Sequence, residues 1–180
     1  MRIIAGVARS RRLVGPPGHT TRPMTDRMRE SLFSSIAVLV PGSVVLDLYA
    51  GSGSMGLEAL SRGAVEVTFV EKDRGALKAL TTNVETIGLG GHIIPSDVDR
   101  FLKGAVGTFD LAFVDPPYAV PLPSLVETLM RVSRLMAPTG TTIVHRRIGT
   151  KAPEVVAALH LVDQREYGGA ELWRYEKEQT

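Results

Sequence analysis

The segment Asp115-Pro116-Pro117-Tyr118 brings a carboxylate, free backbone carbonyls and an aromatic ring together in four residues. It follows the apolar run 109–114, which is typical of a strand buried on both faces. Neither proline has a backbone N–H, so the strand must end there. In open α/β sheets, ligands bind at the carboxyl ends of strands. With a glycine loop upstream at 51–56, the segment indicates a site that binds a nucleoside cofactor and presents a flat amine to it.

The glycine loop has the sequence Gly-Ser-Gly-Ser-Met-Gly and lies between an apolar run and a helical pattern. Its glycines allow a tight turn and a close approach of the backbone to a ligand. Nicotinamide and flavin enzymes also use such loops, so the loop alone leaves the ligand open. Asp47 favours S-adenosylmethionine over NAD, because its carboxylate would repel a pyrophosphate and can pair with an amino group.

Acidic residues also follow the next strands along the chain. Glu71 lies 20 residues beyond Gly51, the offset expected for a carboxylate that binds ribose hydroxyls. Asp97 has two open interpretations, an acceptor for the adenine amine with Val98 beside the ring or a helix N-cap, and it can be both. The expected cofactor-binding residues of this region are Asp47, Tyr49, Ala50, Gly51, Ser52, Gly53, Gly56, Glu71, Lys72, Asp97 and Val98.

The elements that must position these residues alternate from residue 43 onward. Strands are expected at 44–48, 65–71, 93–94, 109–114 and 141–144, with a closing antiparallel hairpin at 161–167 and 170–175. Helices are expected between the strands, one of them begun by a Ser124 and Glu127 capping box and another begun by Pro153. The pattern predicts an α/β, Rossmann-like fold with a mostly parallel seven-stranded sheet, helices on both faces and an antiparallel C-terminal hairpin.

Residues 1–40 form a basic N-terminal extension to the domain expected at 41–180. A β-hairpin arm is predicted first, followed by a helix with Thr25 as its N-cap. Residues 1–30 hold seven arginines against two carboxylates, a charge of +5, so the other 150 residues carry −3 of the net +2. A solvated surface is the ordinary alternative, but arginine suits phosphate, so the extension is expected to bind RNA. The arginines expected to contact phosphate are Arg9, Arg11, Arg12 and Arg22.

The composition excludes several kinds of chemistry. The chain of 180 residues has no cysteine, which rules out disulfides, thiolate metal sites and a cysteine nucleophile. Its four histidines lack metal-ligand spacing, so no metal is expected. No apolar stretch approaches the ~20 residues of a membrane helix, and no signal peptide is recognisable. A cytoplasmic monomer that does not bind membranes is therefore expected.

With these motifs in place, the chain resembles the class I S-adenosylmethionine-dependent methyltransferases. Its Asp-Pro-Pro-Tyr segment matches the [Asp/Asn]-Pro-Pro-[Tyr/Phe] motif of enzymes that methylate exocyclic or amide nitrogen. The resemblance implies that Asp115, Pro116, Pro117 and Tyr118 form the catalytic segment. The Asp115 carboxylate and the Pro116 carbonyl would hold the N–H bonds of the amine, while Tyr118 stacks on an unstacked base.

The N-terminal residues narrow the resemblance to one family. The segments 2–6, Arg12-Leu13 and 22–33, with its Arg-Pro-Met-Thr-Asp-Arg-Met-Arg-Glu-Ser-Leu-Phe run, are similar to the bacterial 16S ribosomal RNA guanine-N2 methyltransferase family RsmD. This implies methylation of guanine 966 on the 30S subunit or its assembly intermediate, with Thr25 helping to close the cofactor pocket. Two departures are Met24, in place of the usual threonine, and His145-Arg146-Arg147, where relatives often carry an acidic residue. We expect the triplet to add RNA phosphate contacts, or His145 to be structural.

Four other functions remain open at this point. The tetrapeptide is shared with adenine-N6 DNA methyltransferases and protein amide methyltransferases, which only the N-terminal run disfavours. A nicotinamide oxidoreductase would use the same glycine loop. Outside the enzymes, the chain could be an RNA-binding assembly factor that retains a vestigial pocket.

Overall fold

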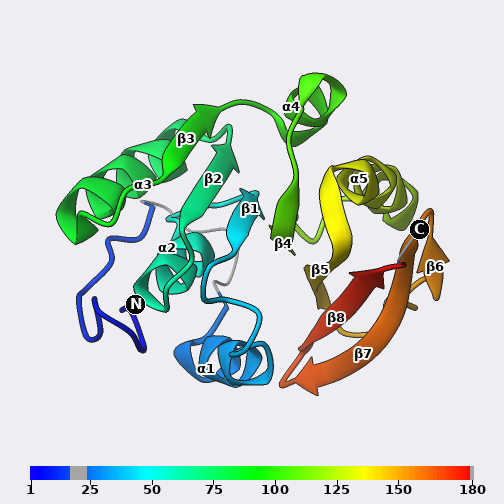
Figure 1. Cartoon of the computed structure of the whole chain (residues 1–180), viewed down its shortest axis with the longest axis horizontal. Coiled ribbons are helices and arrows are strands. Elements are labelled where there is room, and N and C mark those ends of the chain that lie inside the picture. The colour runs from blue at the N-terminus through cyan, green and yellow to red at the C-terminus, as the bar shows by residue number, and fades with distance from the viewer. Residues whose placement is uncertain (17–23, 179–180) are drawn as a thin grey trace.

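The computed structural model describes residues 1–16 and 24–178, which contain a single sheet of eight strands in the order β3-β2-β1-β4-β5-β8-β7-β6 (Figure 1). Strands β1 to β5 pair in parallel, and β8, β7 and β6 pair antiparallel. This confirms the expected α/β fold with its closing hairpin. The elements are α1 (Asp26–Ser35), β1 (Val44–Leu48), α2 (Ser54–Ser61), β2 (Glu66–Glu71), α3 (Arg74–Ile87), β3 (His92–Pro95), α4 (Val98–Gly104), β4 (Phe109–Val114), α5 (Leu122–Leu135), β5 (Met136–Arg147), β6 (Val155–Val156), β7 (Leu159–Tyr167) and β8 (Ala170–Lys177).

Helices cover both faces of the sheet because successive strand residues point to opposite sides. In β1, Val45 packs in a hydrophobic cluster with residues of α1, α2 and α3, whereas Leu46 and Leu48 pack in a second cluster with residues of α4 and α5. Strand β1 is thus fixed between two layers of helices. The carboxyl ends of β1, β2 and β4 lie along one edge of this rigid frame (Figure 1).

The N-terminal extension packs onto the first of these faces. Arg2 and Arg12 form an isolated antiparallel bridge, which gives the arm its hairpin path. Ile3, Leu13 and Phe33 are buried in the same cluster as Val45. The division into 1–40 and 41–180 stays a prediction, while the described part of the extension shares a core with the sheet.

Strand β5 differs from the expected segment 141–144, because it spans Met136–Arg147. The preceding helix α5 begins at Leu122, after Pro121, and its N-cap makes no side-chain hydrogen bond, so the expected capping box at Ser124 is wrong. A proline in the first turn sets the helical φ without a cap. The C-terminal extension of β5 has a physical cause in β8, which pairs with it through Arg147.

The helix expected from Pro153 is also wrong. Val155 and Val156 form the short strand β6, which pairs antiparallel with His160 and Leu159 of β7. Branching at Cβ favours extended backbone, and a tight turn at Ala157, with φ 53°, returns the chain. The sheet consequently has eight strands where seven were expected.

Two features, a long apolar helix and a cluster of metal ligands, are absent from the described residues. No helix within 1–16 and 24–178 is long and apolar enough to cross a membrane. The same residues contain no group of three or more histidine, aspartate or glutamate side chains that could hold a metal ion.

Candidate active site

A cavity of about 750 Å³ lies at the carboxyl ends of β1, β2 and β4. Its volume falls within the range of small-molecule sites, roughly 300–1,000 Å³. The wall is formed by Tyr49, Ala50, Gly51, Ser52 and Ser54, by residues 70–73, 115–118 and 120, by Ala76, Ser96 and Val98, and by Met1, Leu13, Gly15, Pro16 and Met24 of the extension. The glycine loop, Glu71 at the end of β2 and the Asp-Pro-Pro-Tyr segment therefore face one space.

The glycine loop turns the chain from β1 into α2. Gly51 has φ 57° and lines the cavity, and Gly53 has φ 79° as the N-cap of α2. Such left-handed backbone favours glycine. Gly56 has a packing role, because an added Cβ would lie 2.3 Å from a ring carbon of Phe69. Only Gly51 of these three belongs to the described wall, while Gly53 and Gly56 shape the turn beneath it.

Glu71, at the end of β2, is held in one orientation at the cavity. Its Oε2 accepts a hydrogen bond from the Gly51 N–H at 2.8 Å. Its Oε1 accepts from the N–H groups of Lys72 and Asp73, each at 2.8 Å. Three backbone donors thus fix the carboxylate beside the glycine loop, and its contact with a ribose stays a prediction.

Asp97 follows β3 and is the N-cap of α4, accepting a hydrogen bond from the Asp99 N–H at 2.9 Å. Its other oxygen pairs with Lys72 Nζ at 2.8 Å, and this hydrogen bond lowers the pKa of Asp97. The Asp97 side chain is half-exposed and lies outside the described cavity wall, to which Val98 belongs. The cap interpretation is confirmed, and an adenine contact by Asp97 stays a prediction.

Asp47 lies beneath the cavity wall. It is 2% exposed, and its Oδ2 accepts a hydrogen bond from the Gly56 N–H at 2.9 Å. Burial raises the pKa of Asp47 well above its usual value, and the carboxylates of Asp115 and Glu71 raise it further. In this position Asp47 anchors the start of α2, and its pairing with a cofactor amino group stays a prediction.

Asp115 lies at the end of β4 and lines the cavity with its side chain 35% exposed. Its Oδ1 lies 2.7 Å from Nδ1 of His145, a buried residue of β5. The parallel pairing of Val114 with Val144 places these two side chains next to each other. Although Asp115 has this polar partner, it remains open to the space that the glycine loop borders.

The rest of the Asp-Pro-Pro-Tyr segment also borders the cavity. Pro116, Pro117 and Tyr118 all belong to its wall. The Tyr118 ring is 39% exposed and meets the His145 ring edge-on, with centroids 5.9 Å apart. A partly exposed aromatic ring thus lies beside the Asp115 carboxylate, and its stacking on a base stays a prediction.

The extension residues chosen from the sequence have different environments. Arg9 and Arg12 are exposed, and Arg22 lies outside the described residues. Arg11 Nη1 donates to the Ile87 carbonyl at 2.8 Å, at the C-terminus of α3. Thr25 caps α1 through the Met28 N–H at 3.2 Å and is not in the described cavity wall. Phosphate binding by the arginines and pocket closure by Thr25 stay predictions.

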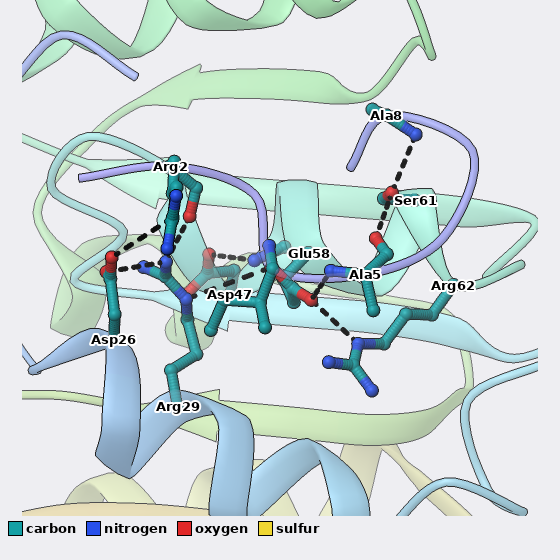
Figure 2. A network of polar contacts seen from close by, with 11 residues as sticks. Arg2, Ala5, Ala8, Asp26, Arg29, Asp47, Glu58, Ser61 and Arg62 are labelled. Carbon is teal, nitrogen blue, oxygen red and sulfur yellow. Dashed lines mark hydrogen bonds and ion pairs between the residues drawn. The ribbon is translucent and has the colours of Figure 1, made fainter. Parts of the chain in front are cut away.

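A buried ionic network holds the extension against α2 (Figure 2). The fully buried Glu58 carboxylate accepts hydrogen bonds from the N–H groups of Ile4 at 2.7 Å and Ala5 at 3.0 Å. Arg62 pairs with the same carboxylate at 2.7 Å, and the buried Arg29 lies 3.9 Å from it. Burial lowers the pKa of Arg29. Through this network the extension is attached to the helix that begins at the glycine loop.

Sequence reasoning left a structural role for His145 open, and it missed the roles of Arg146 and Glu58. His145 and Arg146 are buried beside the Asp-Pro-Pro-Tyr segment. The available signal was register: β4 and β5 are adjacent parallel strands, so residues at their carboxyl ends must lie side by side. Glu58 pairs with Arg62 at the i,i+4 spacing that is typical of an exposed helix face, so the local pattern did not indicate its burial.

The chain is similar to known proteins over nearly its whole length. A family model described as conserved hypothetical protein 95 matches residues 1–176. The chain is 33% identical to the putative rRNA methyltransferase YlbH of Bacillus subtilis, over 98% of this chain and 99% of that protein. It is also 33% identical to ribosomal RNA small subunit methyltransferase D of Escherichia coli, over 99% of this chain and 90% of the relative.

A solved structure has the same architecture throughout. The putative methyltransferase yhhF from Escherichia coli superposes with a TM-score of 0.88 at 35% identity. The match covers 100% of this chain and 99% of that one. The extension is thus part of the shared architecture.

Proposed function

We propose that this chain, which belongs to the conserved hypothetical protein 95 family together with the ribosomal RNA small subunit methyltransferase D (RsmD) proteins, methylates the exocyclic N2 amine of a guanine in 16S ribosomal RNA. It is an S-adenosylmethionine-dependent methyltransferase of ribosomal RNA. The RsmD resemblance gives position 966 as the target, on the 30S subunit or its assembly intermediate. One observation supports the proposal above all: Asp115 borders the same cavity as Gly51 and Glu71.

The electrostatics of the cavity fit S-adenosylmethionine. Among the side chains of its described wall, Glu71, Asp73 and Asp115 carry carboxylates and Lys72 carries an ammonium, and Met1 adds the amino terminus of the chain. A wall with excess negative charge attracts a sulfonium and an amino group and repels the pyrophosphate of a dinucleotide. Glu71 would hold the ribose hydroxyls, the Gly51 loop would approach the cofactor backbone, and Val98 would contact the adenine. The bound cofactor supplies an electrophilic methyl group on sulfur.

The Asp-Pro-Pro-Tyr segment supports the transfer to an amine. A guanine N2 amine is a poor nucleophile because its lone pair is delocalised into the ring. The Asp115 carboxylate and the Pro116 carbonyl would accept its two N–H bonds and turn the lone pair toward the methyl group. The amine gains positive charge as it attacks, so the carboxylate stabilises the transition state more than the ground state.

The substrate base must leave its helix to reach this segment. Tyr118 exposes its ring beside Asp115 and can stack on an unpaired base. The exposed Arg9 and Arg12 of the extension provide charge for the neighbouring phosphates. Recognition would then combine stacking at the site with backbone contacts on the arm.

The proposal is tested by tritium transfer from labelled S-adenosylmethionine to 30S particles that lack the modification. Naked 16S ribosomal RNA, DNA and a protein extract serve as the competing substrates. Digestion of the labelled RNA should give N2-methylguanosine as the only labelled nucleoside. Label confined to DNA or protein, or found in another nucleoside, contradicts the proposed substrate.

A further inference from the structure

Two buried residues at the end of β5, His145 and Arg146, contact the Asp-Pro-Pro-Tyr segment. They are 4% and 5% exposed, respectively. Their backbone is fixed on both sides, since β5 lies between β4 and β8 in the sheet. This burial excludes the RNA phosphate contacts that the sequence suggested for the two side chains, whereas the next residue, Arg147, is exposed.

His145 fixes one oxygen of the Asp115 carboxylate. An ionised carboxylate can accept hydrogen bonds but cannot donate them. In the 2.7 Å contact with ionised Asp115, His145 Nδ1–H is therefore the donor and Asp115 Oδ1 the acceptor. Among residues 1–16 and 24–178, no side chain or N–H donates to Asp115 Oδ2. The contact therefore orients the carboxylate through Oδ1 and leaves Oδ2 for an amine in the cavity.

Arg146 fixes the path of the chain that follows. Its Nη2 donates to the Val120 carbonyl at 3.0 Å, and its Nη1 lies 3.5 Å from the Pro117 carbonyl. The Val120 N–H also donates to the Pro117 carbonyl, at 2.9 Å. The Pro116 carbonyl receives no hydrogen bond from any described residue. Arg146 thus occupies two carbonyls of the turn and leaves free the one that the proposed reaction uses.

We propose that His145 and Arg146 are positioning residues for methyl transfer, a role that rests on the proposed function and extends it. His145 sets the orientation of the Asp115 carboxylate, and Arg146 holds the 117–120 turn. The two acceptors for the amine are then preorganised before the base arrives. Displacement of reacting groups by about 1 Å can cost on the order of 100-fold in rate, so this support acts on the chemical step rather than on cofactor binding.

Three substitutions at one position separate positioning from simple packing. His145→Asn places an amide N–H close to the position of Nδ1, His145→Gln places one close to Nε2, and His145→Leu has no donor. We expect kcat on 30S particles to fall about 10- to 100-fold in the Leu and Gln variants and to stay within about threefold of wild type in the Asn variant. Affinity for S-adenosylhomocysteine, measured by calorimetry, should be unchanged in all three.

Controls make each outcome decisive. His160→Asn, at a half-exposed histidine of β7, serves as the matched control, and Arg146→Met should lower kcat about 10-fold with the same cofactor affinity. An Asn variant as slow as the Leu variant, with intact S-adenosylhomocysteine binding, overturns the role of the Nδ1 donor. Wild-type kcat in the Leu and Gln variants overturns it as well. Inactive wild-type protein would instead contradict the proposed function, so the two failures are distinguishable.

Discussion

The buried Glu58 carboxylate accepts a hydrogen bond from the Ile4 N–H at 2.7 Å, across 54 residues of sequence. This contact attaches the arm to α2, whose N-terminus carries the glycine loop (Figure 2). The segment expected to meet RNA and the segment expected to meet the cofactor are therefore mechanically linked through one helix.

Removing the Glu58 charge should destabilise the fold strongly. Glu58→Leu leaves the buried Arg29 without its nearest buried counter-charge and two arm N–H groups without an acceptor. Loss of one partner from a buried ion pair typically costs about 3–5 kcal/mol, which urea unfolding would measure. Glu66→Leu, at an exposed carboxylate of β2, is the matched control. A change below about 1 kcal/mol in Glu58→Leu would show that the network contributes little.

Arg9 and Arg11 should have separable effects. Arg9→Ala should weaken RNA binding and reduce the slope of log affinity against log salt by about 0.7–0.9, because one phosphate contact is lost. Arg11→Ala should instead lower stability by about 1 kcal/mol, because the hydrogen bond to the α3 C-terminus is lost. Filter binding across a salt series and urea unfolding check the two outcomes. An unchanged salt slope for Arg9→Ala excludes its phosphate contact.

The buried Asp47 predicts a specific pH dependence of stability. Its pKa in the folded protein lies above the unfolded value, so the folded state keeps the proton longer. The stabilisation is complete below the unfolded pKa and is lost as pH rises through the folded pKa. Asp47→Asn cannot ionise, so its free energy of unfolding should exceed that of wild type near pH 8, with the gap narrowing toward pH 4.

The same variant tests the cofactor role given to Asp47. If the carboxylate pairs with the amino group of the methionine moiety, Asp47→Asn weakens S-adenosylhomocysteine binding while it stabilises the protein. If Asp47 only anchors α2, affinity stays at the wild-type level. A pH-independent difference in stability between the two proteins would contradict the ionisation account.

Local sequence patterns were sufficient to predict much of the secondary structure of this molecule. Short apolar runs alternate with segments of helical periodicity, and this alternation predicts the parallel strands. The two prolines predict where β4 ends. Thr25 and Asp97 act as helix N-caps, as their positions predicted. These features depend on neighbours within a few residues, which the sequence displays directly.

Features that depend on distant partners could not be predicted in the same way. The length of β5 depends on its pairing with β8, and β6 forms because it pairs with β7 at the edge of the sheet. The burial of Glu58 depends on an arm more than 50 residues away. The contact of His145 with Asp115 needs both the register of two strands and a side-chain orientation, and only the register follows from the fold.

The role of Asp115 at the cavity is tested most directly by Asp115→Ala, measured with wild type for S-adenosylhomocysteine binding and for methyl transfer to unmodified 30S particles. We expect cofactor affinity within about threefold of wild type and a loss of at least about 100-fold in kcat, because the lost carboxylate stabilises the charged transition state. Asp110→Asn, at the opposite end of β4, should behave as wild type in both measurements. Methyl transfer by Asp115→Ala at the wild-type rate would contradict the account.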